Sequence, residues 1–170
     1  MLDREGLVAA FDELGALLHA RGLRGTVFVV GGAALALAFD ARRTTRDVDA
    51  VFEPKAEVYR AARDVAGGLG LPEDWLNDAV KGFLPGPDPA PIPVYESPGL
   101  AVAAGSARYL LALKLLASRV EQDVDDIRFL FGELGLTTPA EGLAILSELY
   151  PQARLAPRTR LLLEEMFGPA

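Results

Sequence analysis

The spacing of hydrophobic positions divides the chain near residue 104. Apolar residues recur every three or four positions over 3–21, which predicts an amphipathic helix. The run 26–30 is β-branched and aromatic, and 46–53 alternates between polar and apolar positions, so both are expected to be strands. "GLAVAA", residues 99–104, predicts a third strand.

Helices are expected between these strands. A short one should leave the Gly31-Gly32 turn, and others should cover 55–66 and 72–83, the last reading "PEDWLNDAVKGF". Prolines concentrate over 85–98, which predicts a loop in which "PVYE" is a candidate edge strand.

After residue 104 the helical spacing returns and continues to the end of the chain. Helices are expected at 107–119, 121–134, 140–149 and 157–167, with Ser106 as the N-cap of the first. The whole pattern predicts an α/β (α+β) fold. We expect a small mixed-sheet core over 1–104, with a helical C-terminal part over 105–170 packed on it.

Composition narrows the function. The chain is 51% hydrophobic and 24% charged, which argues against disorder. Its net charge of −7 disfavours a protein that coats nucleic acid, although a local basic patch remains compatible with it. Without cysteine there are no disulfides, thiolate zinc sites or cysteine nucleophiles. No apolar run is long enough for a membrane span and no signal peptide is evident, so we expect a cytoplasmic protein.

Asp47 and Asp49 are the first candidates for chemistry. On a strand they share one face with Val51, while Val48 and Ala50 face the core. Two carboxylates about 4 Å apart repel by roughly 1 kcal/mol in water and about 4 kcal/mol at an effective dielectric near 20. An enclosed pair therefore needs a cation, and Mg²⁺ (or Mn²⁺) takes carboxylate oxygens and shares its shell with phosphates. The alternative is an exposed pair at a strand end.

Other residues near this pair are suited to phosphate. Gly31 and Gly32 allow a tight turn and a close approach, and the following helix presents free N–H groups. Arg43, Thr45 and Arg46 supply further donors beside the carboxylates. The alternatives are a plain strand-to-helix turn and a solvated turn that balances charge.

Together, "VVGGAALALAF" and "RRTTRDVDAVF" resemble the DNA polymerase β-like nucleotidyltransferase superfamily. The resemblance implies that Gly31 and Gly32 contact the triphosphate, with Arg43, Thr45 and Arg46 alongside, and that Asp47 and Asp49 are catalytic metal ligands. It implies two-metal chemistry in which the metals activate an acceptor hydroxyl and neutralise charge at the transferred phosphate.

The helical half extends the resemblance. "LALKLLASRVEQDVDDIRFL" and "DWLND" are similar to elements of AbiEii-type toxin nucleotidyltransferases and their small relatives. This implies that Lys114 and Asp123 or Asp126 line the nucleotide site as catalytic residues. The alternative is an interhelix salt bridge, because Asp123 falls on an apolar stripe and should be paired with Lys114 or Arg119.

One feature departs from the superfamily pattern. Many active members place a third carboxylate on a neighbouring strand, but "GLAVAA" has none and Glu96 is only a candidate. The favoured function is metal-dependent transfer of a nucleoside monophosphate from an NTP to RNA, for instance a tRNA end, in a toxin-like enzyme with a cognate antitoxin. The alternatives are nucleotidylation of a small molecule such as an aminoglycoside-like drug, and a degenerate module that binds a nucleotide or a protein.

Overall fold

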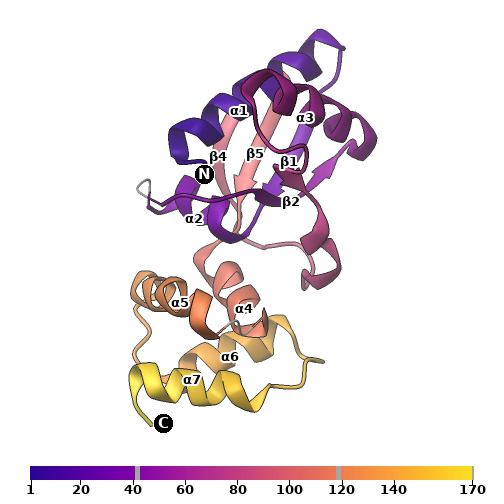
Figure 1. The fold of residues 1–170 in the computed structure, drawn as a ribbon. Helices are drawn as coiled ribbons and strands as arrows, with labels where there is room; N and C mark the ends of the chain where they lie inside the picture. The colour runs from indigo at the N-terminus through magenta and orange to yellow at the C-terminus, as the bar shows by residue number, and fades with distance from the viewer. Residues whose placement is uncertain (41–42, 118–119, 170) are drawn as a thin grey trace. The chain divides into compact units, whose positions relative to one another are not determined.

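The computed structural model describes residues 1–40, 43–117 and 120–169, which adopt an α+β fold with a five-stranded mixed sheet (Figure 1). The chain divides into two units. The first unit comprises Met1–Gly82 and Pro89–Gly105, and the second comprises Phe83–Asp88 and Ser106–Ala170. The predicted fold class, a mixed-sheet core followed by a helical bundle, is confirmed.

Helices and strands alternate up to residue 97, and a further strand follows directly. They are α1 (Arg4–Ala20), β1 (Gly25–Val29), α2 (Gly31–Ala38), β2 (Val48–Glu53), α3 (Lys55–Leu69), β3 (Leu76–Asn77), the 3-10 helix η1 (Ala79–Phe83), β4 (Ile92–Ser97) and β5 (Leu100–Ala104). The strand order is β3-β2-β1-β5-β4. Strand β1 is antiparallel to β2 and parallel to β5, while β4 is antiparallel to β5 and forms the edge that "PVYE" predicted.

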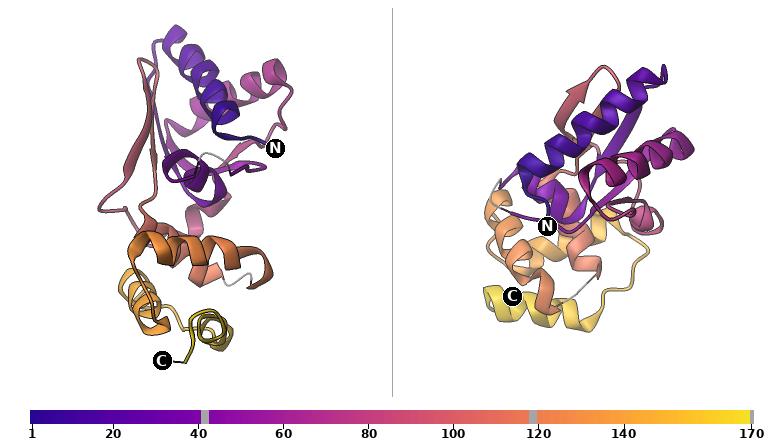
Figure 2. Two further views of the ribbon diagram at one scale, coloured as in Figure 1. Left: turned by 90° about the vertical axis from the view of Figure 1, so that its left-hand side faces the viewer. Right: turned by 45° about the horizontal axis from the view of Figure 1, so that its top comes forward.

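The two faces of the sheet have different surroundings. Helices α1 and α3 cover one side of the sheet, as the left view of Figure 2 shows. Val27, Ala50 and Val102 are buried, and Gly25, on the Val27 face of β1, lies against Leu18 of α1 and Val58 of α3. The residues that alternate with them point to the other face, where Phe28 is half-buried and Thr26 is exposed. Burial on one face only is typical of an antiparallel or mixed sheet with a second, accessible face.

The helix predicted for 72–83 is wrong. Trp75 is fully buried there, and its indole N–H donates to the Ala62 carbonyl at 2.9 Å. The Trp75 carbonyl accepts from the Val48 N–H at 2.6 Å, and the next two residues form β3 parallel to β2. Pairing with a distant strand therefore overrides the local helical pattern, and only the 3-10 helix η1 remains from it.

The second unit is built from four helices in the described part of the chain. They are α4 (Ala107–Ala117), α5 (Val120–Leu134), α6 (Pro139–Leu149) and α7 (Pro157–Phe167). The Ser106 hydroxyl accepts from the Tyr109 N–H at 3.3 Å, which confirms the predicted N-cap of α4. The end of the predicted helix 107–119 lies outside the described residues.

The core of the second unit contains close aromatic packing. Phe131 of α5 stacks on Phe167 of α7 with ring centroids 4.1 Å apart. A Cβ on Gly142 of α6 would come within 2.5 Å of the Phe131 ring, so this helix needs a glycine at the contact. Helix α6 begins with a capping box between Thr138 and Glu141, which satisfies N–H groups of its first turn.

Two tyrosines attach segment 83–88 to the second unit. The Tyr109 hydroxyl donates to the Gly86 carbonyl, and the Tyr150 hydroxyl donates to the Phe83 carbonyl, both at 2.6 Å. Burial, with a smaller effect of the Asp88 charge, raises the pKa of Tyr109 to about 12, and burial also raises the pKa of Tyr150. Both hydroxyls therefore keep their protons and donate at neutral pH. Among the described helices, none has the length and apolar composition needed to cross a bilayer.

Candidate functional site

The glycine turn lies at the end of β1, where the chain enters α2. Gly31 has a φ of +66°, a left-handed conformation that favours glycine. A Cβ on Gly31 would lie 3.4 Å from Oδ2 of Asp49, and a Cβ on Gly32 would lie 3.1 Å from Oγ1 of Thr45. The structure thus brings the predicted phosphate-binding turn against two of the residues predicted to act with it.

The N-terminus of α2 is suited to an anion. Its N-cap, Val30, has no side chain that accepts from the first-turn N–H groups, and the first turn carries no acidic residue. The exposed N–H groups and the helix dipole both favour negative charge at this position. Asp49 is the carboxylate that the geometry places beside the turn, so a phosphate there requires a cation between them.

The two aspartates have different backbone settings. Asp49 lies in β2, on the face opposite the buried Val48 and Ala50, and its carbonyl accepts from the Val30 N–H at 2.9 Å. Asp47 lies one residue before β2, so strand alternation does not fix the direction of its side chain. Both side chains are half-buried, a degree of exposure that leaves them accessible to a small ion.

The donors predicted around the pair are not equivalent. Thr45 is buried, and its hydroxyl donates to the Asp47 carbonyl at 2.9 Å, which holds the approach to β2 in place. The guanidinium of Arg43 lies 3.8 Å from an Asp40 carboxylate oxygen. Arg46 is exposed. Thr45 therefore acts on the shape of the site, whereas Arg46 is accessible to a ligand.

The strand beside β2 supplies an oxygen that the sequence pattern did not assign. Asn77 of β3 is the parallel register partner of Asp49, so both residues point to the same face of the sheet. The Asn77 side-chain oxygen accepts from the Ala79 N–H at 3.2 Å. An amide thus lies next to Asp49 on the side of β2 away from β1, as an oxygen donor that the sequence did not predict.

The strands on the other side offer little help as a third carboxylate. Ala101 and Ala103 are the β5 residues that alternate with buried positions, and neither bears a polar group. Glu96 of β4, the candidate from the sequence, pairs with Arg24. Its Cα register partner is Ala101, so two strands, β1 and β5, separate it from β2 along the sheet order.

The donor set fits a magnesium ion that arrives with phosphate. Within the described residues, no group of three or more histidine, cysteine, aspartate or glutamate side chains is arranged to hold a metal ion. Mg²⁺ seldom needs such a cage, because one or two carboxylates and substrate phosphates typically complete its shell with water. The Asp49 carboxylate beside the Gly31 turn matches that requirement.

A second polar cluster lies beside Asn77. Asp78 accepts from the Tyr59 hydroxyl at 2.6 Å and pairs with the Lys55 ammonium at 2.5 Å. The hydrogen bond from Lys55, followed by that from Tyr59, holds the pKa of Asp78 below its usual value, and the same bond raises the pKa of Lys55. The cluster connects α3 to the end of β3 and so supports the position of Asn77.

The predicted helix pair is present in the second unit. Nζ of Lys114 lies 2.6 Å from Oδ1 of Asp123 and 2.7 Å from Oδ2 of Asp126, and Asp123 is only 6% exposed. Burial lowers the pKa of Lys114, but hydrogen bonds to the two carboxylates outweigh it and raise the pKa overall. The predicted pairing of Asp123 with Lys114 is confirmed, while Arg119 lies outside the described residues. The predicted catalytic role of the three residues stays a prediction.

Comparison of this chain with models of known protein families, with curated proteins and with solved structures found no match.

Proposed function

We propose that the protein is a metal-dependent nucleotidyltransferase, which moves a nucleoside monophosphate from an NTP to an acceptor. The observation that carries the proposal is the contact of the glycine turn with the Asp-x-Asp strand. Gly31 faces the Asp49 carboxylate and Gly32 faces the Thr45 hydroxyl. A side chain on either glycine would occupy the space between the turn and these groups. A bare turn at a helix N-terminus beside a carboxylate suits a phosphate that carries its own cation.

The site residues of the first unit have distinct tasks in this proposal. The N–H groups at the start of α2 bind the triphosphate, and Gly31 and Gly32 let it approach the backbone. Asp47 and Asp49 hold Mg²⁺ or Mn²⁺, with Asn77 beside Asp49. Arg46, which is exposed, is available to the phosphates. When bound, the metal supplies Lewis acidity at the transferred phosphate.

The proposed reaction is a displacement at phosphorus. The acceptor hydroxyl oxygen forms a bond to the α-phosphorus of the NTP, and the bond from that phosphorus to the bridging oxygen of the β-phosphate breaks. Pyrophosphate leaves, and the hydroxyl proton passes to solvent water. The chain contributes by orienting the triphosphate against the turn, so that positioning and charge stabilisation account for most of the catalysis.

An RNA acceptor and a protein partner follow from the resemblance only. RNA such as a tRNA end, a cognate antitoxin and a cytoplasmic location stay predictions. Incubation of the protein with each labelled NTP, Mg²⁺ and total RNA tests the transfer directly, because label must become covalent on an acceptor.

A binding experiment separates the nucleotide site from the acceptor. Calorimetry with an NTP analogue that resists cleavage next to the α-phosphate should show binding that depends on Mg²⁺. Asp49→Asn should weaken it, while Asp125→Asn, an exposed carboxylate of α5, should bind like wild type. Equal affinity for all three proteins would refute the metal role of Asp49.

A non-catalytic nucleotide-binding module is the second candidate. The small side chains on the accessible face of β5, Ala101 and Ala103, and an amide at Asn77 in place of a carboxylate favour it. Such a module would bind the NTP analogue with Mg²⁺ and lose binding with Asp49→Asn, but no label would become covalent on any acceptor.

A further inference from the structure

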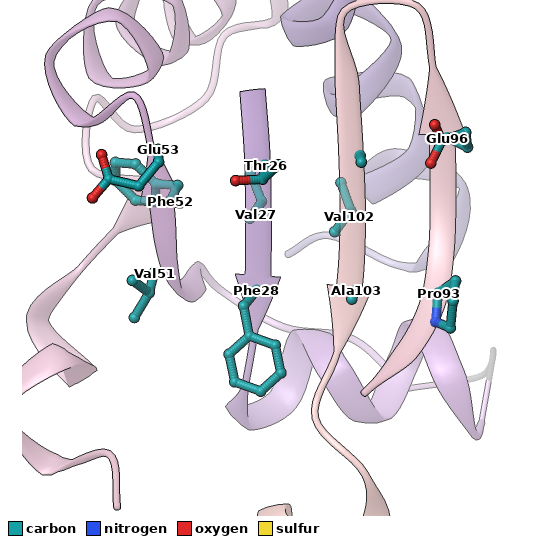
Figure 3. Close-up of a pocket in the computed structure, with 11 residues that line it drawn as sticks. Thr26, Val27, Phe28, Val51, Phe52, Glu53, Pro93, Glu96, Val102 and Ala103 are labelled. Carbon is teal, nitrogen blue, oxygen red and sulfur yellow. The ribbon is translucent and has the colours of Figure 1, made fainter. Parts of the chain in front are cut away.

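A groove of about 440 Å³ runs over the accessible face of the sheet, and Figure 3 shows the side chains that line it. It is formed by β2, β1, β5 and β4, all within the first unit. Its volume is in the range typical of small-molecule sites. Asp49 points to the same face of β2, so the groove and the proposed nucleotide site share one surface.

One row across the groove has a carboxylate at each end. Glu53 pairs in register with Thr26, Thr26 with Ala101, and Ala101 with Glu96. Figure 3 shows the Glu53 and Glu96 carboxylates at its two sides. Glu96 is shared with Arg24, whereas the Glu53 carboxylate accepts the Lys55 backbone N–H at 3.2 Å.

The neighbouring row is apolar and lies nearer the glycine turn. It consists of Val51, Phe28, Ala103 and Pro93, again in direct register. Ala103 of this row and Ala101 of the first row leave space beside the Phe28 ring. Figure 3 shows this ring extending along the face. The next residue of β2 on this face is Asp49, about 13 Å along the strand from Glu53 at roughly 3.3 Å per residue.

The charge of the lining selects the ligand. Among the described residues, the charged side chains that line the groove are Glu53 and Glu96, and no lysine or arginine does so. The two carboxylates would repel a phosphate-rich strand. A purely polar sugar would meet only apolar side chains along the Phe28 row and would lose hydrogen bonds to water there. A cation with an apolar body meets both rows favourably.

We infer that the groove binds the acceptor of the proposed transfer, a small hydroxyl compound with an apolar ring and a cationic amine. The inference rests on the proposed function. The amine lies on the Thr26 row between the two glutamates, the ring covers Phe28 and Ala103, and the hydroxyl points along β2 towards Asp49. The hydroxyl oxygen then bonds to the α-phosphorus, pyrophosphate leaves, and the proton passes to water.

Binding of two matched probes tests the inference without nucleotide or metal. Tyramine and 3-(4-hydroxyphenyl)propionate share a ring and a hydroxyl but carry opposite charges. NMR titration of the full chain in EDTA should show that tyramine binds and that the anion binds roughly tenfold more weakly or worse, because like charges oppose it. Shifts should fall on residues of β1, β2 and β5.

Three variants assign the binding to the groove. Ala103→Leu fills the apolar row and should weaken the binding of tyramine roughly tenfold or more, since a filled groove buries less of the tyramine ring. Glu53→Gln should weaken it about threefold, the size expected of an exposed ion pair. Glu13→Gln removes an exposed carboxylate from α1, on the other side of the sheet, and should bind like wild type. Ala101→Leu replaces Ala103→Leu if that variant does not fold.

Several outcomes would overturn the inference. They are equal binding of the two probes, tyramine binding that survives a filled groove, and no saturable binding of tyramine at millimolar concentration. Tighter binding of a short RNA by Glu53→Gln would assign the groove to RNA instead. If tyramine binds with charge selectivity but receives no label from an NTP, the groove remains assigned as a binding site and the proposed transfer is rejected for this acceptor. Failure of the groove assignment can therefore be distinguished from failure of the proposed transfer.

Discussion

The second unit holds Asp123 and Asp126 around one lysine, whereas the first unit places Asp49, two residues after Asp47, beside a glycine turn. The ammonium of Lys114 lies within 2.7 Å of both carboxylates of its cluster, and Asp123 is buried. In the first unit a Cβ on Gly31 would lie 3.4 Å from Oδ2 of Asp49, and both aspartates are half-exposed. Two similar sequence patterns thus have different physical solutions.

A structural carboxylate and a functional one differ in where their strongest partner lies. A buried carboxylate needs a partner within the fold, and removing that partner destabilises the protein. A carboxylate at a ligand site instead keeps access to solvent and gains its strongest partner only when the ligand binds. Four predictions, from the largest expected effect to the smallest, test whether the two clusters divide in this way.

The largest effect should come from removing the shared cation of the second unit. Lys114→Met leaves two largely buried carboxylates without their ammonium, and it should lower the free energy of unfolding by about 3–5 kcal/mol. Asp123→Ala should cost less, about 1–3 kcal/mol, because Asp126 still pairs with Lys114. Urea unfolding measures both, with exposed Asp125→Ala as the control within about 0.5 kcal/mol of wild type. If Lys114→Met unfolds like the control, the cluster is not a stability device.

The second effect concerns ligand stabilisation of the first unit. Mg²⁺ and an NTP at about a hundred times Kd should stabilise the wild type by about 2.7 kcal/mol, because they bind the folded state. Asp49→Asn should abolish this gain, and Asp47→Asn should do the same while its Tm in EDTA stays unchanged or rises. Thermal melts in EDTA and in Mg²⁺ plus each NTP measure both quantities. A wild type indifferent to metal and nucleotide would make this pair structural too.

The third effect is at the turn itself. Gly31→Ala forces a left-handed backbone on alanine at a φ of +66°, which should cost about 1–2 kcal/mol, and it places a methyl group beside Asp49. Gly22→Ala is the matched control, since Gly22 has a φ of +70° and no neighbour within 4 Å of its Cβ position. Both variants should lose similar stability in urea unfolding, but only Gly31→Ala should lose metal-dependent binding of the NTP. Loss of binding by both would attribute the effect to strain alone.

Local patterns were sufficient to predict the parts of this comparison that depend on neighbours in sequence. The strand before Gly31, the strand that carries Asp49 and the helix that carries Asp123 were all predicted from spacing, because burial of one face fixes the period. The N-cap at Ser106 could also be predicted, because its partner, the Tyr109 N–H, is only three residues away.

Contacts between distant segments could not be predicted. The pairing of the Trp75 carbonyl with Val48 creates β3 and brings Asn77 beside Asp49, but the local pattern of "PEDWLNDAVKGF" is helical. The groove depends on the order β2-β1-β5-β4, which aligns Glu53 with Glu96 across four strands. Strand order is a property of the whole sheet, and a single strand's pattern does not specify it.

The smallest effect should come from Asp78, a carboxylate that has a protein cation, as Asp123 has, but at the surface. Lys55 and Tyr59 lower its pKa in the folded protein. A lowered folded pKa adds stability that is present above the unfolded pKa of about 3.9 and is lost as pH falls through the folded value. At neutral pH, Asp78→Asn should therefore melt slightly below wild type, by less than Lys114→Met, Asp123→Ala or Gly31→Ala, because the Lys55 side chain is half-exposed and solvent screens the pair. The difference in Tm between the two proteins should shrink below about pH 4, where the wild-type carboxylate also takes up a proton. Melts across this range check the sign. A difference that grows as the pH falls would mean that Asp78 is stabilised in its protonated form, and the surface cluster would then not behave as a weak version of the buried one.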